Sequence, residues 1–449
     1  MVSHETAEVP RTLAEGPPPR SLGLMDQTVL WGNLGISLLL IVAGTFVLAP
    51  DPALPPLSLL AALTAIVVGA VLGNLLLGLG ARAGAETGAP AMVLIRGLLG
   101  RQGSWLPTGA NIAQNLGWAT VEIMVIASAA GRLIEPDLRW LAVIATGGAA
   151  TLMAMRPLGV VRGYLKRIAI WVVLASTLYL FVQVLRQPLP SFSTGSWTGF
   201  WKATDIVISL PISWLPLAAD YSRHSRSPRA AFGGAMVGYG AATIAFFVLG
   251  VLATAGDVAG DDVIASLLAL PAGTIALVIL VIDEVDEVFA NVYSTVVSAQ
   301  NVAPRLDRRL AAVAVGLIAT ASALAFDDYV AYESFLLLLG SVFVPLFAAF
   351  VVDYYLLRRG TWDVTETSPA RWAMVIPWAA GFVTYQLINP GLVASWQHFW
   401  IDRQHDLGFS PPSWTSASIM SFLVAAIVAL GVGRLSSAGA ASAVSTSST

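Results

Sequence analysis

Apolar runs of about 20 residues, separated by short polar linkers, follow one another along almost the whole chain of 449 residues. An α-helix needs about 20 apolar residues to cross the hydrocarbon core of a bilayer. Only 11% of the residues are charged, whereas a soluble domain carries about a quarter, so the chain could not cover a water-facing surface. We therefore predict an all-α integral membrane protein of about twelve transmembrane helices, with spans at 28–49, 57–80, 106–131, 138–156, 165–185, 202–219, 231–256, 272–299, 308–326, 329–357, 371–389 and 415–434.

These spans form a single predicted transmembrane domain, residues 28–434, between two polar ends. Residues 1–27 are expected to be a cytoplasmic tail without the features of a cleaved signal peptide, and residues 435–449, rich in Ser and Ala, a disordered tail. With the N-terminus inside, nineteen of the 24 Lys and Arg residues fall in the inner segments. Because positive charge concentrates on the cytoplasmic side, we predict a multi-pass protein of the plasma (inner) membrane with both termini cytoplasmic.

The composition excludes several classes of function. The chain has no cysteine, which rules out disulfides, thiol catalysis and zinc–thiolate sites. A net charge of −3 gives no indication of a nucleic-acid partner. The four histidines all fall in tails or loops, and no nucleotide loop or Ser–His pairing is present. The sequence therefore predicts a transporter without a cofactor rather than a membrane-embedded enzyme.

The third span carries polar residues on one helical face. Asn111, Asn115, Trp118 and Glu122 are spaced by four, three and four residues, so their side chains lie above one another on a helix. The amides could serve as hydrogen bonds between packed helices. Glu122 needs a further reason, because an ionisable group inside the membrane is unfavourable and marks a functional site by default.

The eighth span contains four acids within five residues, Asp283, Glu284, Asp286 and Glu287. In a low-dielectric site four neighbouring carboxylates cannot all be ionised, and no basic residue lies nearby in the span. A solvated vestibule would be one explanation. The alternative that we favour is coupling to a proton or to sodium, with Asn291 on the same helical stripe as Asp283 and Glu287.

Two spans are predicted to be broken helices. In the sixth span Pro211 and Pro216 flank Ser213 and Trp214, and each proline removes a backbone donor and clashes with the preceding turn. The first span has glycines on both sides of Asn33. Breaks five helices apart fit a five-plus-five inverted repeat with a binding site at the breaks, although ordinary proline kinks would give the same pattern.

Five segments of the chain resemble one transporter family. Residues 94–107 and 115–122 are similar to the arginine–glycine loop and the third-helix Gly-Trp motif of the nucleobase–cation symporter family, first class (purine/cytosine permeases). Residues 213–223, 291–301 and 335–359 resemble the family's sixth, eighth and tenth helices. The resemblance extends from about residue 28 to 434, and the branch that it fits best is that of the cytosine permeases and hydroxymethylpyrimidine transporters.

The resemblance implies a leucine-transporter-type fold, alternating access, and a flat heterocycle held at mid-membrane. It assigns ring stacking to Trp118 and a ring contact to Asn291. Glu122 stands where relatives have an amide. At the position of a second stacking aromatic this chain has Pro211, and Trp214 is the candidate to replace that aromatic.

The resemblance also bears on the coupling ion. Sodium-binding relatives place small hydroxyl residues about a turn before the eighth-helix Asn, where this chain has Val285 and Asp286. A proton is therefore the preferred coupling ion, and sodium is the alternative and the only metal considered.

These observations predict a cation-coupled importer (symporter) of a nucleobase or related pyrimidine, such as cytosine or hydroxymethylpyrimidine. A carrier of amino acids or other organic amines on the same fold is the rival, because an anionic site would bind an ammonium group. The predicted substrate-binding residues are Trp118, Glu122, Asn115, Ser213, Trp214 and Asn291. The predicted cation-coupling residues are Asp283, Asp286 and Glu287.

Overall fold

The computed structural model describes residues 12–446, apart from 17, 52, 134–137, 156–169, 256–262 and 326–331. The described part of the chain is helical, and its β structure is limited to two isolated bridges. Each predicted span contains at least one helix. The helices that correspond to the spans are α1 (Leu24–Asn33), α2 (Leu38–Leu48), α3 (Leu59–Thr87), α6 (Trp105–Leu133), α7 (Arg139–Met155), α9 (Ile170–Val184), α10 (Phe200–Trp214), α11 (Ala218–Ser222), α12 (Pro228–Ala255), α14 (Gly273–Asp283), α15 (Val285–Val302), α16 (Arg308–Ala325), α17 (Tyr332–Val351), α18 (Val375–Ile388) and α20 (Ala417–Thr446).

Five uninterrupted helical segments are long and apolar enough to cross a bilayer on their own, and they belong to α3, α12, α16, α17 and α20. The pair α1 and α2 makes a sixth span if the two are counted together. The remaining predicted spans correspond to helices that are interrupted, more polar or shorter. The whole stretch between the fourth and fifth predicted spans lies outside the described residues.

Both predicted breaks are present. Helices α1 and α2 meet at 66° across a gap of four residues, where the chain contains Gly35. In the sixth span α10 continues past Pro211, and the α-helical pattern changes after Trp214 to a single 3₁₀ turn, Leu215–Leu217, which contains Pro216 and precedes α11. The break therefore lies slightly later than the sequence suggests, because Pro211 is accommodated inside the helix.

The eighth span differs from the continuous helix that we predicted. It is interrupted at Glu284, between α14 and α15. The backbone N–H of Glu284 still donates to Leu280 O at 2.9 Å, so the interruption is only one residue long. Neither glycine nor proline stands there, which is why the sequence gives no signal for it.

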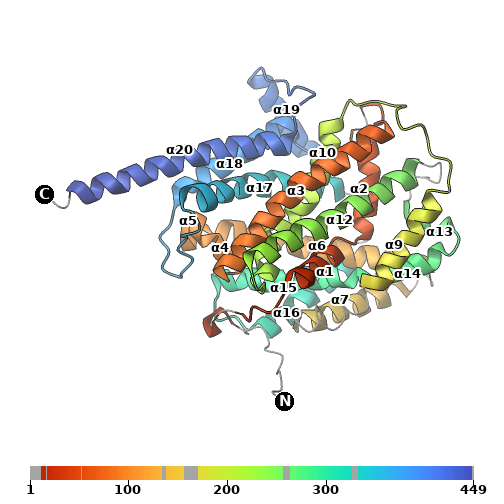
Figure 1. Ribbon diagram of the computed structural model, residues 1–449, viewed down its shortest axis with the longest axis horizontal. Helices are drawn as coiled ribbons and strands as arrows, with labels where there is room; N and C mark the ends of the chain where they lie inside the picture. Colours follow the sequence, from red (N-terminus) through yellow and green to blue (C-terminus); the bar gives the residue numbers. More distant parts are fainter. Residues whose placement is uncertain are drawn as a thin grey trace, which may run out of the picture.

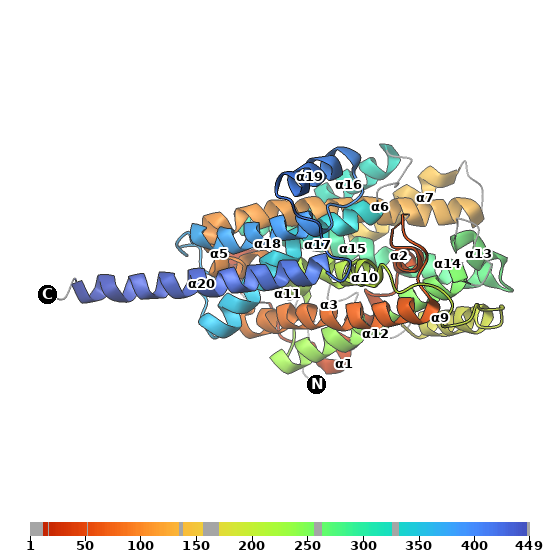
Figure 2. The same cartoon turned by 90° about the horizontal axis from the view of Figure 1, so that it is seen from above.

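The helices lie roughly side by side, as Figure 1 shows. Viewed from above, α3 and α12 lie on one side of the bundle and α6 and α7 on the other, with α10 and α15 between them (Figure 2). Helix α3 packs along α12 and α10, and α15 packs along α6 and α7. The central helices are therefore surrounded by others, which is where polar side chains can be kept from lipid.

Small residues allow the closest of these crossings. A Cβ atom on Gly250 of α12 would lie 2.1 Å from the carbonyl oxygen of Ile41, and one on Gly44 of α2 would lie 2.7 Å from that of Phe247. Any larger residue at either position would push α2 and α12 apart. Close backbone contact through small residues is a usual way for membrane helices to associate.

Several short helices were not predicted. These are α4 (Ala91–Leu94) and α5 (Arg96–Gly103) before α6, α13 (Val263–Ala269), and α19 (Ala394–Asp406) between α18 and α20. Helix α20 runs to Thr446 and projects from the bundle (Figure 1), although we expected disorder from residue 435. Alanine, the strongest helix former, recurs through this tail. The division of the chain into tails and one domain stays a prediction.

Candidate functional site

A narrow cavity lies where the broken first and sixth spans meet the third and eighth. Its empty space amounts to about 300 Å³, but only about 10 Å³ of it can hold the centre of a water-sized sphere. A flat ring can enter only if the walls move apart, so this conformation is closed around the site. The lining residues are Ser37, Leu39, Leu40, Trp118, Glu122, Leu210, Ser213, Trp214, Leu217, Glu287 and Asn291.

Most of the predicted substrate residues come together in this cavity. Trp118, Glu122, Ser213, Trp214 and Asn291 all line it, although they come from three different spans. The prediction of their roles is a separate matter, which geometry alone does not test. Their convergence nevertheless follows from the helical spacing and from the break near Ser213.

Asn115 is the exception among the predicted substrate residues. It is fully buried but does not line the cavity. Neither atom of its amide has a hydrogen-bond partner among the described residues. Asn111, one turn earlier, donates to Ser298 Oγ at 2.8 Å and so joins α6 to α15. Asn111 thus has the helix-joining role that the sequence left open for both amides.

Two indoles stand in the cavity wall with different aromatic neighbours. The ring of Trp118 lies 5.1 Å from Phe335 and 5.9 Å from Tyr332, both in edge-on arrangements. The ring of Trp214 lies 5.9 Å from Tyr239 and 6.4 Å from Trp31. Edge-on packing of this kind fixes a ring without covering its face.

Glu122 and Asn291 are direct partners. The amide nitrogen of Asn291 donates to both carboxyl oxygens of Glu122 at 3.1 Å, and to the carbonyl oxygen of Glu287 at 3.1 Å. Glu122 is 1% exposed. The hydrogen bond orients the carboxyl group, so its position is set by α15 as well as by its own helix α6.

The four acids of the eighth span divide between two places. Glu287 lines the cavity, whereas Asp283 and Asp286 face the end of α1. The amide nitrogen of Asn33 donates to Asp286 at 2.6 Å and to Asp283 at 3.3 Å. Oδ1 of Asp286 accepts no hydrogen bond from any described donor. These two acids are thus bound to the broken first span and not to the cavity itself.

Glu284 has a structural role that the sequence did not indicate. Its carboxyl group accepts from Ser37 Oγ at 2.6 Å and from the backbone N–H of Leu38 at 2.9 Å. It therefore caps the N-terminus of α2, where unpaired N–H groups and the helix dipole favour a negative charge. Asn33 and Ser37 are the polar residues at this break that we did not assign; the glycines around Asn33 were the available signal.

The site contains acids without matching bases. None of the described residues that line the cavity is Lys, Arg or His. Within the part of the chain that is described, no three His, Cys, Asp or Glu side chains are placed to hold a metal ion. The acids of the cavity therefore have no basic partner among the described lining residues.

Broken helices that meet at a central polar cavity are the hallmark of secondary transporters. The fold is similar to that of Mhp1, a nucleobase-cation-symport-1 family transporter, in a closed conformation with bromovinylhydantoin bound; the TM-score is 0.71 at 15% identity, over 96% of this chain and 95% of that chain. It is also similar to a Na⁺-coupled sialic acid symporter (TM-score 0.62, 9% identity, 95% and 93% of the two chains). A third similar structure is MhsT in complex with L-phenylalanine (0.52, 14%, 93% and 99%). These likenesses confirm the leucine-transporter-type five-plus-five fold.

The sequence itself identifies the family. A family model described as "Permease for cytosine/purines, uracil, thiamine, allantoin" matches residues 19–380. The chain therefore belongs to this family of permeases, and it is a multi-pass membrane transporter and not an enzyme, as predicted. No curated protein matches the chain.

Proposed function

We propose that this permease imports a pyrimidine-type base, such as cytosine or hydroxymethylpyrimidine, by cation-coupled alternating access. The observation that carries the proposal is the convergence of Trp118, Glu122 and Asn291 on one closed cavity between broken helices. Trp118 stacks on the ring, and Glu122 with Asn291 pairs with its amino group and ring nitrogens. Ser213 and Trp214 complete the lining from the sixth span, and Asn115 is buried about one turn before Trp118 on the same helix.

The coupling cation is held by Asp283, Asp286 and Glu287 in this proposal. Asp283 and Asp286 share one amide donor, Asn33, at the break of the first span. A proton is the preferred cation, because a carboxyl group that gains one outside and releases it inside moves across the membrane without a buried charge. Sodium is the alternative, because the sialic acid symporter of similar fold is Na⁺-coupled.

The rival substrate class is amino acids or other organic amines. An amino acid brings a carboxylate, which broken-helix transporters receive at the N-terminus of a half-helix. Here the N–H of Leu38 at that position is bonded to Glu284, and none of the described lining residues is basic. These contacts favour a base over an amino acid, while a small amine without a carboxylate would still suit the acids.

The orientation belongs to the same proposal. With both termini in the cytoplasm of a cell bounded by this plasma (inner) membrane, nineteen of the 24 basic residues face inward. The outer ends of α2 and α10 then carry the ion pair between Asp51 and Lys202.

Uptake of labelled cytosine, hydroxymethylpyrimidine, uracil and adenine by cells that lack their own base permeases tests the substrate class. We expect saturable accumulation of at least one aminopyrimidine, and competition by bases but not by amino acids. Competition by amines or amino acids alone would favour the rival. In proteoliposomes, an imposed proton gradient should drive accumulation without sodium; accumulation that responds to sodium alone would exclude the proton.

A further inference from the structure

Hydrogen-bond acceptors dominate the polar surface of the central cavity. The carboxyl groups of Glu122 and Glu287 both reach it. The two serine hydroxyls in its wall already donate to other protein oxygens, and the amide nitrogen of Asn291 is bonded to Glu122 and to the backbone of Glu287. The indole N–H of Trp118 also lies in the lining and has no partner among the described residues, but it cannot serve both carboxyl groups. A ligand that fills this cavity must therefore bring donors of its own for them, since buried acceptors without donors are unfavourable.

The two glutamates act as a pair. Both side chains line the same narrow cavity, Asn291 Nδ2 donates to the carboxyl group of Glu122 and to the backbone oxygen of Glu287, and Glu122 is 1% and Glu287 3% exposed. Two neighbouring buried carboxyl groups cannot both be ionised, so the pair holds a proton. Oε1 of Glu287 has no donor among the described residues. The empty pair is thus a unit that holds one proton and has one carboxyl oxygen without a described donor.

We propose that this pair binds the amidine edge of an amino-heterocycle, a ring nitrogen next to a carbon that carries an NH₂ group. The inference rests on the proposed base transport and narrows its substrate class. The amino group donates one hydrogen to Glu122 and one to Oε1 of Glu287. The ring nitrogen takes the proton that the glutamates share, and the new N–H donates to the second oxygen of Glu122.

The proton balance of this step is closed. The carboxyl O–H bond breaks as the ring nitrogen uses its lone pair to form an N–H bond, so the charge of the occupied site equals that of the empty one. The product is an amidinium facing a carboxylate, the same paired-donor geometry that makes Arg–carboxylate contacts strong. A keto base such as uracil presents a carbonyl oxygen where the NH₂ group would be. This oxygen can only accept the proton that the pair holds, in a neutral hydrogen bond, so the stronger amidinium–carboxylate pair does not form.

Paired ligands that differ only at this edge test the inference. We would measure binding of cytosine against uracil, and of 4-amino-2-methylpyrimidine against 2-methylpyrimidin-4-one, to the purified full-length protein in detergent. Hydrogen bonds to charged groups are the strong class, so wild type should prefer each amino compound by about 10- to 100-fold. In Glu122→Gln and in Glu287→Gln the preference should fall below about threefold, because an amide can also donate to a keto oxygen.

Glu333→Gln supplies the matched control. Glu333 is a partly buried acid that lines a separate outer cavity beside Lys202, and its replacement should keep the wild-type preference. If the wild type binds the keto compounds as tightly as the amino compounds, the proposed binding of the amidine edge by the glutamate pair is wrong, whereas the proposed base transport is unaffected. Binding of benzylamine as tight as that of the aminopyrimidines would also contradict the proposal, because a positive charge alone would then be sufficient for binding. Failure of every base in the uptake panel overturns the proposed function itself.

Discussion

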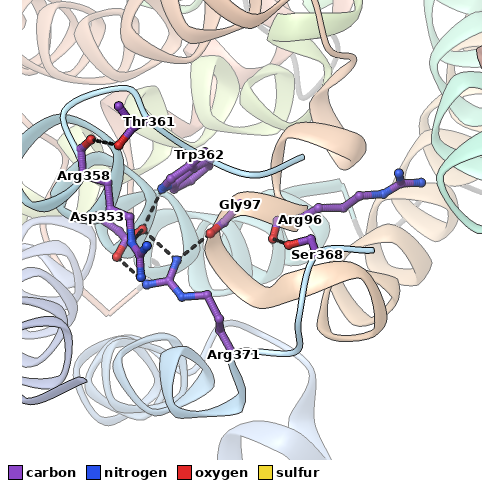
Figure 3. A network of polar contacts seen from close by, with 8 residues as sticks. All are labelled: Arg96, Gly97, Asp353, Arg358, Thr361, Trp362, Ser368 and Arg371. Atoms are coloured by element: carbon purple, nitrogen blue, oxygen red, sulfur yellow. Dashed lines mark hydrogen bonds and ion pairs between the residues drawn. The ribbon is translucent and has the colours of Figure 1, made fainter. Parts of the chain in front are cut away.

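Two buried polar clusters in this protein are built in opposite ways. Just after the C-terminal end of α17, Asp353 accepts two hydrogen bonds from Arg371, at 2.7 and 2.9 Å, and one from the indole N–H of Trp362 at 2.7 Å (Figure 3). Arg358 adds a longer contact at 3.9 Å. In the central cluster, by contrast, Asp286 is bonded to a neutral amide, and one of its oxygens has no described donor.

The Asp353 cluster, which consists of Asp353 and its partners Arg371, Trp362 and Arg358, joins segments that are far apart in the chain. Arg371 also donates to the carbonyl oxygen of Gly97 at 2.5 Å, and so ties the segment before α6 to the end of α17. A Cβ atom on Gly97 would lie 2.3 Å from the ring of Trp362, so only glycine fits under that ring. This cluster has every partner that it needs within the protein, which is what a structural ion pair requires.

The two clusters differ in what the loss of an acid would leave behind. Asp353 would leave an unpaired guanidinium behind if it were removed, whereas the central acids would leave only amides and hydroxyls. A buried acid that the protein does not pair with a base is a candidate to bind a mobile cation. We therefore expect Asp353 to serve stability, and Asp286 with its neighbours stays our proposed coupling site.

The largest effect that we predict is on coupling. Asp286→Asn should abolish accumulation against a gradient while leaving exchange of labelled for unlabelled substrate largely intact, because the substrate cavity does not include this residue. Paired accumulation and exchange assays in proteoliposomes at the same protein density would show it. If the variant still accumulates substrate under a proton gradient, Asp286 is not a coupling residue.

A second large effect is expected in the Asp353 cluster, and it concerns the stability of the protein. Removal of one partner of a buried ion pair costs about 3–5 kcal/mol, so Asp353→Ala should sharply lower the yield and the thermal unfolding temperature in detergent. Asp286→Asn, measured alongside, should lower neither. Equal destabilisation by the two substitutions would erase the distinction between the clusters.

The sequence predicts different parts of this comparison to different depths. Helical spacing alone is enough to bring Trp118 and Glu122 to one face, and the two prolines predict the break after Ser213. The interruption at Glu284 has no local signal. Nor does its cap on α2, because Ser37 lies 247 positions away in the chain and spacing rules reach only a few turns. Pairing across such separations is set by the packing of whole helices.

A smaller effect concerns the cavity wall. Stacking of a base on an aromatic side chain is worth roughly 1–3 kcal/mol, so Trp118→Ala should weaken substrate binding by about one to two decades. Trp372→Ala removes an exposed indole that does not line the cavity and is the control for loss of a tryptophan. A folded Trp118→Ala protein that binds as tightly as wild type would refute the stacking role.

The smallest effect should come from a third kind of acid, outside the spans. Asp51 pairs with Lys202, whose side chain is 45% exposed. Burial alone would raise the pKa of Asp51, but hydrogen bonds from Lys202 and from the backbone of Ala53, together with the charge of Lys202, outweigh it and lower that pKa. A lowered pKa means that the stabilisation is present above the unfolded-state value, about 3.9, and is lost as the pH falls through the folded-state value.

Exposed pairs are worth about 0–1 kcal/mol. Asp51→Asn should therefore lower the unfolding temperature only slightly at pH 7, and the difference from wild type should shrink below about pH 4. Thermal unfolding at the two pH values, with Lys202→Met and the double variant completing the cycle, measures this directly. A loss comparable to that of Asp353→Ala would mean that an exposed pair can serve as the buried one does, and the distinction drawn from burial would fail.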